Sequence, residues 1–398
     1  MNWILQKVLL SSIYIWLFTS FFLFSHILYI LWIEKSINIF SIWGFEWIKS
    51  VFINILWIIS FIFLLLFQDK FYEKNNIKWL YSWIIITAII ISSIFTIWSW
   101  DFFFWLSEKH HWWLYYISLV FIFLAISIWY KKSYYYKTIK VIFIFFVILW
   151  LYSIFQKLWI DPLSSLYKTR VSLTRVFWTL WNANYLAGLC IVLFPLIHLL
   201  RNKYYKYILF IYCFIVLLLT GSYFWIAVLL IYLLYKSYTI NKKIFLWWVI
   251  IFLTIFIHIF NTIWIEKIWS LKARPYIWIS SISAIIESPK SFLIWNWPDT
   301  LQEVFDSHKH EKLNIYETST YTADRSHNIF IDLIYFFWIF WWWIIIFFLL
   351  YAVKISQNIY IKESIILFLI FFSFNIPVTI HFIIIVLLLA RIYQNKWK

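Results

Sequence analysis

Charged residues are scarce in this sequence of 398 residues, and their scarcity excludes an ordinary soluble protein. Only 13% of the residues are Asp, Glu, Lys or Arg, whereas 65% are hydrophobic and the mean hydropathy is +0.85. Soluble proteins are about half apolar. A soluble chain of this length could not cover so much apolar surface, so the composition indicates a membrane protein.

Cysteine is equally rare, which argues against a disulfide framework or a cysteine metal centre. The two cysteines, Cys190 and Cys213, both lie inside apolar runs. Cysteines in that setting are typically small buried hydrophobic residues. We therefore predict neither a disulfide nor a metal site from them.

Long apolar runs dominate the rest of the chain, and a run of about 20 apolar residues can cross a bilayer as a helix. The first run is too long for the hydrophobic part of a signal peptide and lacks a small-residue cleavage site. We predict an all-α polytopic membrane protein of about 12 transmembrane helices, with residues 1–398 forming a single integral membrane domain. Divisions near Gly221 and Pro377 could change the count by two. The predicted spans are 8–33, 51–67, 79–99, 114–130, 141–156, 184–200, 207–220, 222–235, 244–263, 329–353, 364–375 and 376–392.

Lysine and arginine are distributed unevenly between the loops, and this sets the orientation. With the N-terminus inside, the inner segments hold 19 of the 33 basic residues but only three of the 17 acidic ones. Inner loops of membrane proteins carry such a basic excess. We therefore predict a multi-pass protein of the cell inner (plasma) membrane with both termini cytoplasmic. The basic excess suits contact with anionic membrane lipid. Nucleic acid is excluded as a partner because no basic face or aromatic-basic binding module occurs.

Two outer connections are long, and long ordered loops often carry function. The first spans about 157–183. The second, 264–328, is the long extracytoplasmic loop between helices nine and ten. It contains two candidate short helices, Pro275–Glu287 and Pro298–Lys312, each with a proline where a first helical turn accepts one.

Glycine is nearly absent, with three residues, while tryptophan occurs 31 times. Average usage predicts about 28 glycines, and membrane helices use more. The segment Trp295-Asn296-Trp297-Pro298 is typical of a turn if its tryptophans are glycines, and Trp341-Trp342-Trp343 lies in the middle of a predicted span. We hypothesise that the source organism reads UGA as glycine and that this sequence was translated with UGA as tryptophan. The alternative is a truly tryptophan-rich protein from an AT-rich genome.

Ionisable residues of the outer loops form three motifs. Arg170 precedes the run 174–188, which reads T-R-V-F-G-T-L-G-N-A-N-Y-L-A-G when its tryptophans are taken as glycine. Arg274 lies near the start of the long loop. The run 324–332, D-R-S-H-N-I-F-I-D, ends that loop and is followed by residues 337–343, which read F-G-I-F-G-G-G on the same basis.

In this order, on the outer side, the motifs resemble the O-antigen ligase and O-antigen polymerase family. These membrane glycosyltransferases use polyprenyl-pyrophosphate-linked glycans, and they contribute to lipopolysaccharide and polysaccharide biosynthesis of the cell envelope. The resemblance covers roughly residues 165–350, and the helix count agrees. The sequence departs from the family where Ser-Arg-Gly-Gly is expected, because Gly221-Ser222-Tyr223-Phe224-Trp225 stands there. Tyr223 replaces the arginine, and the expected substitute is Arg170 or Arg175.

The reaction that the resemblance implies needs fixed cations and a base. The leaving pyrophosphate gains negative charge, and the planar arginine fork binds two phosphate oxygens at once. The acceptor hydroxyl loses a proton, for which neutral histidine is suited near pH 7. The predicted catalytic residues are therefore His327, Arg274 and Arg175. No Asp-x-Asp pair lies in a suitable place, so we predict no metal and no cofactor.

Further residues are predicted to bind substrate: Arg170, Asn182, Asn184, Asp332 and Arg325. Each has a structural alternative. Asn182 or Asn184 can cap a helix, and Asp332 can begin a helix or hold His327. Arg325 can be a solvated loop charge, while Arg175 and Arg274 can be boundary residues that extend toward water. His327 can simply lead into a helix.

The resulting prediction is transfer of a glycan from a polyprenyl-pyrophosphate carrier to an acceptor hydroxyl on the outer face. A ligase would use a lipid, protein or glycan acceptor, and a polymerase would use a second lipid-linked repeat. A secondary transporter or flippase is the alternative, since twelve helices with both ends inside fit it equally well. Against it, no repeat relates the two halves, and few charges lie in mid-membrane. An inactive relic is a third reading.

Overall fold

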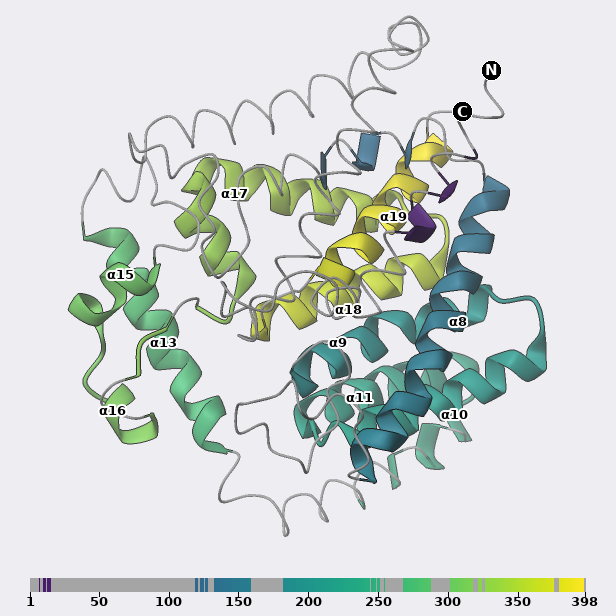
Figure 1. Cartoon of the computed structure of the whole chain (residues 1–398), viewed down its shortest axis with the longest axis horizontal. Coiled ribbons are helices and arrows are strands. Elements are labelled where there is room, and N and C mark those ends of the chain that lie inside the picture. The colour runs from purple at the N-terminus through teal and green to yellow at the C-terminus, as the bar shows by residue number, and fades with distance from the viewer. Residues whose placement is uncertain are drawn as a thin grey trace, which may run out of the picture.

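The computed structural model describes a little more than half of the chain, and the regular secondary structure of this part is helical (Figure 1). The described residues are a few between 7 and 15, most of 119–158, nearly all of 182–250 together with 254, then 268–287, 301–317, 321–375 except 324 and 325, and 379–396. No strand occurs among them, and the all-α prediction is confirmed for this part of the chain.

The helices fall into three groups along the chain. The first runs α8 Lys132–Lys157, α9 Ala183–Leu193, the 3₁₀ helix η3 Pro195–Leu199, α10 Lys203–Leu219 and α11 Tyr223–Ile240. The second lies in the long predicted loop: α13 Ile268–Ile286, α15 Leu301–Phe305, η4 Asp306–His308 and α16 Leu313–Tyr316. The third is α17 Ile329–Ile355, α18 Ile359–Phe374 and α19 Thr379–Lys396.

Most described helices overlap a predicted apolar run, although their ends differ by up to nine residues: α8 begins at Lys132, whereas its run is 141–156. Runs 207–220, 222–235 and 329–353 correspond to α10, α11 and α17, and the last two runs correspond to α18 and α19. Run 184–200 is divided between α9 and η3, because Pro195 has no N–H to continue the α-helix and begins the 3₁₀ turn. The runs 8–33, 51–67, 79–99, 114–130 and 244–263 lie wholly or largely outside the described residues.

A tight turn separates α10 from α11, at the position where the sequence left the helix count open. Gly221 has φ 58°, a left-handed conformation that glycine adopts without steric cost. The preceding α10 ends at Leu219, and α11 begins at Tyr223 after its N-cap residue Ser222. The apolar segment is therefore two helices rather than one.

Helix α18 forms the centre of the described core. It contacts α9, η3, α17 and α19, and its residues Ile365, Phe368 and Phe371 are almost completely buried. Figure 1 shows α13, α15 and α16 together at one side of the molecule, beside α17, with α8 and α10 at the opposite side. The described parts of the long loop thus form a helical group that packs on α17.

Large apolar side chains also face outward, in stripes along single helices. On α10 the exposed positions Tyr204, Ile208, Ile211, Ile215 and Leu218 recur every three or four residues and so share one face. Among the described residues, only α11 is both long and apolar enough to cross a membrane, and Ala183–Leu199, Trp343–Ile355 and Ile380–Gln394 are shorter apolar helices. The number of membrane crossings stays a prediction.

The two short helices predicted in the long loop are only partly correct. Pro275 does not begin a helix, because α13 already runs from Ile268 and contains Pro275 in its interior. The segment 298–312 is not one helix either: α15 ends at Phe305, η4 ends at His308, and residues 309–312 are non-helical before α16. The loop is helical as predicted, but with different boundaries.

Candidate functional site

Arg274 lies where the long loop meets the end of α18. Its guanidinium Nη1 donates a hydrogen bond to the carbonyl oxygen of Phe374, and Nη2 lies 3.5 Å from Oδ1 of Asn375. Asn375 is the C-cap of α18 and is buried. The last carbonyls of a helix carry partial negative charge, so a cation is favoured there. Arg274 therefore joins α13 to the C-terminal end of α18.

The charge of Arg274 persists despite its burial. Burial lowers the pKa of Arg274, and electrostatic interaction with Tyr185 and Tyr321 opposes that shift. An arginine remains protonated in proteins at any physiological pH. Arg274 is thus a fixed, partly desolvated cation beside one tyrosine of the first motif and another of the long loop.

The first motif is held in place through its backbone. The ring nitrogen Nε2 of His381 lies 3.1 Å from the carbonyl oxygen of Tyr185. His381 is completely buried, and its ring stacks on Phe371 with centroids 4.6 Å apart. Phe371 in turn packs directly against Gly188, the last residue of the motif. His381 belongs to none of the sequence motifs, and its contact positions Tyr185.

The two asparagines of the first motif have different partners. Oδ1 of Asn182 accepts a hydrogen bond from the backbone N–H of Asn184 at 2.8 Å, so Asn182 is the N-cap of α9. Oδ1 of Asn184 accepts a hydrogen bond from the hydroxyl of Ser222, also at 2.8 Å. Capping is thus the role that the structure gives Asn182, whereas Asn184 connects the first motif to the turn before α11.

Ser222 is a residue that sequence reasoning missed. It lies in the segment that departs from the family pattern, directly before Tyr223, and it is buried. The available signal was the serine of the expected Ser-Arg-Gly-Gly, which this chain retains although it lacks the arginine. The contact with Asn184 places that segment beside the first motif.

His327 occupies a turn that is fixed on both sides. It has φ 56°, the left-handed region that few residues other than glycine adopt. Oδ1 of Asp332 accepts hydrogen bonds from the backbone N–H of Ser326 at 2.9 Å and from its hydroxyl at 2.6 Å. Asn328 follows as the N-cap of α17. The buried carboxylate of Asp332 therefore holds the residue before His327, while it also lies in the first turn of a helix as predicted.

Two unsatisfied polar groups lie next to the partners of Arg274. Within the described part of the chain, Nδ2 of Asn375 and Nε1 of Trp278 are buried and make no hydrogen bond. Trp278 is one helical turn after Arg274 and its ring lies 6.1 Å from that of Phe374. Buried donors usually have partners. The Nδ2 donor of Asn375 is therefore unpaired beside the guanidinium in the described part of the chain.

The remaining predicted site residues, Arg170, Arg175 and Arg325, lie outside the described residues, so their roles stay predictions. No group of three or more side chains that could hold a metal ion occurs in the described part. Comparison with protein families, with curated proteins and with solved structures finds no match to this chain.

Proposed function

We propose that this chain is a polytopic membrane glycosyltransferase that moves a glycan from a polyprenyl-pyrophosphate carrier to an acceptor hydroxyl on the outer face. The observation that carries the proposal is the setting of Arg274. It brings together the long loop, the first motif through Tyr185 and the end of α18 through Asn375. These segments are about 90 to 100 residues apart in sequence, and the resemblance assigns two of them to one site.

The placement of helix ends supports the membrane part of the proposal. The topology derived from lysine and arginine puts Asn184, Ser222, Arg274 and Asn375 on the outer side. Hydrogen bonds join Asn184 to Ser222 and Arg274 to Asn375. The exposed apolar stripe on α10 supports it as well, because a wide apolar face on a soluble monomer would be exposed to water.

The chemistry follows from the charges of this site. The acceptor oxygen attacks the anomeric carbon of the donor sugar, and the bond from that carbon to the pyrophosphate oxygen breaks. The electron pair leaves with the lipid pyrophosphate, whose added negative charge Arg274 stabilises by paired hydrogen bonds. The acceptor proton passes to neutral His327, which the Ser326–Asp332 hydrogen bonds hold in position. Each residue then has one task.

The deciding experiment is the glycan profile of cells that lack the gene and carry either the wild-type chain or a variant. Glycines would be restored at UGA codons if recoding is found. We expect His327→Ala and Arg274→Gln to accumulate lipid-linked glycan and to lose the finished conjugate. Long lipid-linked chains would indicate a ligase, and single repeats a polymerase.

Matched controls separate chemistry from folding. His310→Ala removes a histidine of the same loop, and Lys272→Gln removes an exposed cation two residues before Arg274 on α13. Both should complement the deletion fully at normal protein levels. An unchanged profile in His327→Ala cells would refute the transferase. Loss of solute uptake with an unchanged profile would establish the transporter instead.

A further inference from the structure

A polar cavity lies at the opposite ends of the helices from the candidate site. Its volume is about 210 Å³, and it lies between the start of α8, the end of η3, the connection from α17 to α18 and the last turns of α19. A water molecule occupies about 30 Å³ in the liquid. The cavity therefore has room for a phosphate group and several waters. It is lined by Tyr135, Tyr136, Leu199, Gln357, Asn358, Ile361 and Arg391.

Arg391 is the only cation in this lining, and it is 7% exposed. Its Nη1 donates to Oε1 of Gln394 at 3.1 Å, and its guanidinium lies over the ring of Tyr135 with 5.8 Å to the centroid. No carboxylate of the described residues pairs with it. A buried charge normally has a counter-charge, because removing an ion from water is costly. Arg391 thus has a neutral setting and lacks a described counter-ion.

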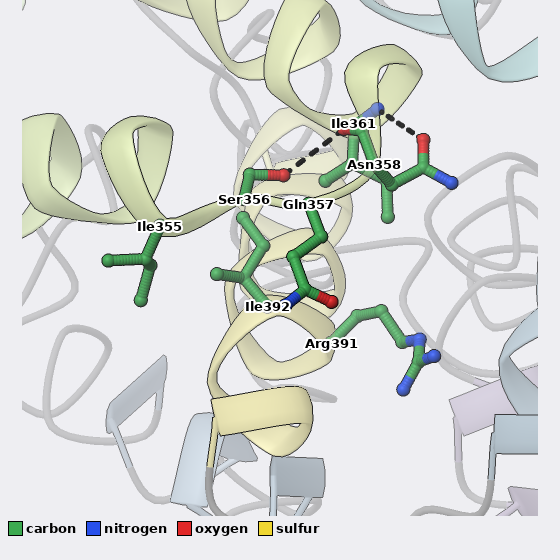
Figure 2. Close-up of a pocket in the computed structure, with 7 residues that line it drawn as sticks. All are labelled: Ile355, Ser356, Gln357, Asn358, Ile361, Arg391 and Ile392. Carbon is green, nitrogen blue, oxygen red and sulfur yellow. Dashed lines mark hydrogen bonds between the residues drawn. The ribbon is translucent and has the colours of Figure 1, made fainter.

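The other polar groups of the cavity are suited to the same kind of ligand. Oδ1 of Asn358 accepts hydrogen bonds from the backbone N–H groups of Tyr360 and Ile361, which leaves its Nδ2 as a donor. Gln357 is exposed and supplies a second amide, and Tyr136 supplies a hydroxyl. Figure 2 shows the guanidinium of Arg391 and the carboxamide of Asn358 extending to the same side, away from Ile355. Donors therefore lie near a positive charge that no described carboxylate compensates.

We infer that this cavity binds the phosphate group of an anionic membrane lipid, with Arg391 as its counter-charge. Arginine pairs with phosphate through two parallel hydrogen bonds, and the neighbouring amides supply further donors. The lipid source follows from location. Tyr135, Leu199, Asn358 and Arg391 all lie at helix ends that the basic loops assign to the cytoplasmic side, where anionic headgroups are enriched.

The apolar rim of the cavity favours a lipid over a soluble anion. Leu199 is half-buried, and Tyr136 is 40% exposed. These side chains border the cavity on the side of α8 and η3, where an acyl chain can follow the apolar helix surface while the phosphate reaches Arg391. The inference depends on the proposed membrane placement but not on glycan transfer.

The test uses the full-length protein purified in a neutral detergent, with lipid added as mixed micelles. A ligand that binds only the folded state raises the unfolding temperature as its concentration rises. We expect phosphatidylglycerol to raise the midpoint and phosphatidylcholine to leave it nearly unchanged. For Arg391→Gln, the phosphatidylglycerol concentration that gives the half-maximal shift should rise about tenfold or more. Arg391→Lys should retain part of the response.

Three further measurements make the result decisive. Arg201→Gln removes an exposed arginine of the same predicted side that does not line the cavity, and it should titrate like wild type. If Arg391→Gln does not fold, Gln357→Ala at an exposed position should still weaken the response several-fold. His327→Ala should respond to phosphatidylglycerol as wild type does, so failure of glycan transfer is measured separately.

Two outcomes would overturn the inference. One is a response of Arg391→Gln to phosphatidylglycerol that equals the response of wild type. If Arg391→Gln cannot be purified, an equal response of Gln357→Ala has the same meaning. The other is an equal stabilisation by inorganic phosphate at the same phosphate concentration, which would assign the cavity to a soluble anion.

Discussion

Gly188 shows how a single missing side chain permits the packing of the candidate site. A Cβ atom built on Gly188 would lie 2.0 Å from Cε2 of Phe371, which is far too close for two non-bonded carbon atoms. Phe371 also stacks on His381, which holds the backbone of Tyr185. Because Phe371 is completely buried, it has no room to move aside.

Replacement of Gly188 by alanine should therefore destabilise the protein by about 1–3 kcal/mol through overpacking. The measurement is thermal unfolding of the purified protein in detergent. The double variant Gly188→Ala, Phe371→Leu should lose less stability than the sum of the two single losses, because leucine leaves room where the edge of the phenylalanine ring lay. Strictly additive losses in this double-mutant cycle would show that the contact with Phe371 does not determine the cost of a side chain at residue 188.

Tryptophan identity is the second question at this scale. Trp278 buries its Nε1 without a hydrogen-bond partner among the described residues, an arrangement that costs about 1–3 kcal/mol and that glycine would avoid. We expect peptides of the protein from its native host to carry glycine at 178, 181 and 278. Mass spectrometry of tryptic peptides decides this directly. Tryptophan at 178 and 181 would disprove recoding, and the first motif would then lose its glycines.

The individual site residues were only partly predictable. The sequence placed His327 and Asp332 at the start of a helix, and both are there. It gave no sign of the left-handed conformation at His327 or of the hydrogen bonds from Ser326 to Asp332, because these depend on how the preceding loop returns to the helix. The bond from Arg274 to the carbonyl of Phe374 joins residues 100 positions apart, which no local pattern encodes.

At the scale of helices, apolar runs located most described helices but not all of their ends, because polar residues can extend a helix beyond its apolar run: α8 begins at Lys132, nine residues before the run 141–156. The error at Pro275 has a physical explanation. Proline inside a helix removes one hydrogen bond to the carbonyl four residues earlier. Helix α13 tolerates that loss because Ala273, Ile277 and Ala284 are buried where it packs on α15, α16 and α17. Tertiary packing, which the sequence pattern does not reveal, outweighs the local preference.

One buried ion pair connects two helices of the core, and it gives a further prediction. Glu363 of α18 accepts hydrogen bonds from Nζ of Lys236 at 2.6 Å and from the hydroxyl of Tyr232 at 2.8 Å, both on α11. Replacing Glu363 by glutamine leaves the lysine without its counter-charge, and the loss of unfolding free energy should be about 3 kcal/mol. Denaturant or thermal unfolding measures it.

The controls for this pair separate charge from position. Glu311→Gln makes the same chemical change at an exposed residue and should alter stability by less than about 0.5 kcal/mol. Lys236→Met combined with Glu363→Gln should recover part of the loss, because no unpaired charge remains. A double variant as unstable as the sum of the single variants would show that the ion pair contributes no coupling between α11 and α18.

At the scale of the whole molecule, the sequence predicted the fold class from composition and a topology from charge. The structure adds that the helix ends assigned to one side meet one another: Asn184 contacts Ser222, and Arg274 contacts Asn375. The ends assigned to the other side line the cavity at Arg391. Such grouping is required if the helices are to span a bilayer in alternating directions.

The topology itself is testable by labelling, because both native cysteines are buried and unreactive in the folded protein. Ser307 is exposed in the long loop, and Thr239 is exposed at the end of α11 that the topology places inside. In intact cells, a membrane-impermeant maleimide should label Ser307→Cys and not Thr239→Cys. After permeabilisation both should react, which shows that Thr239→Cys is accessible to the reagent.

The reversed pattern would place the long loop in the cytoplasm and would remove the candidate site from an outer-face reaction. Labelling of both variants in intact cells would mean that the two segments share one side, so the run 244–263 between them would not cross the membrane. Only labelling of Ser307→Cys alone brings Arg274 and His327 to the side where a lipid-linked glycan, once translocated, would meet its acceptor. The result therefore decides between an outer-face transferase and any function that requires this loop inside the cell.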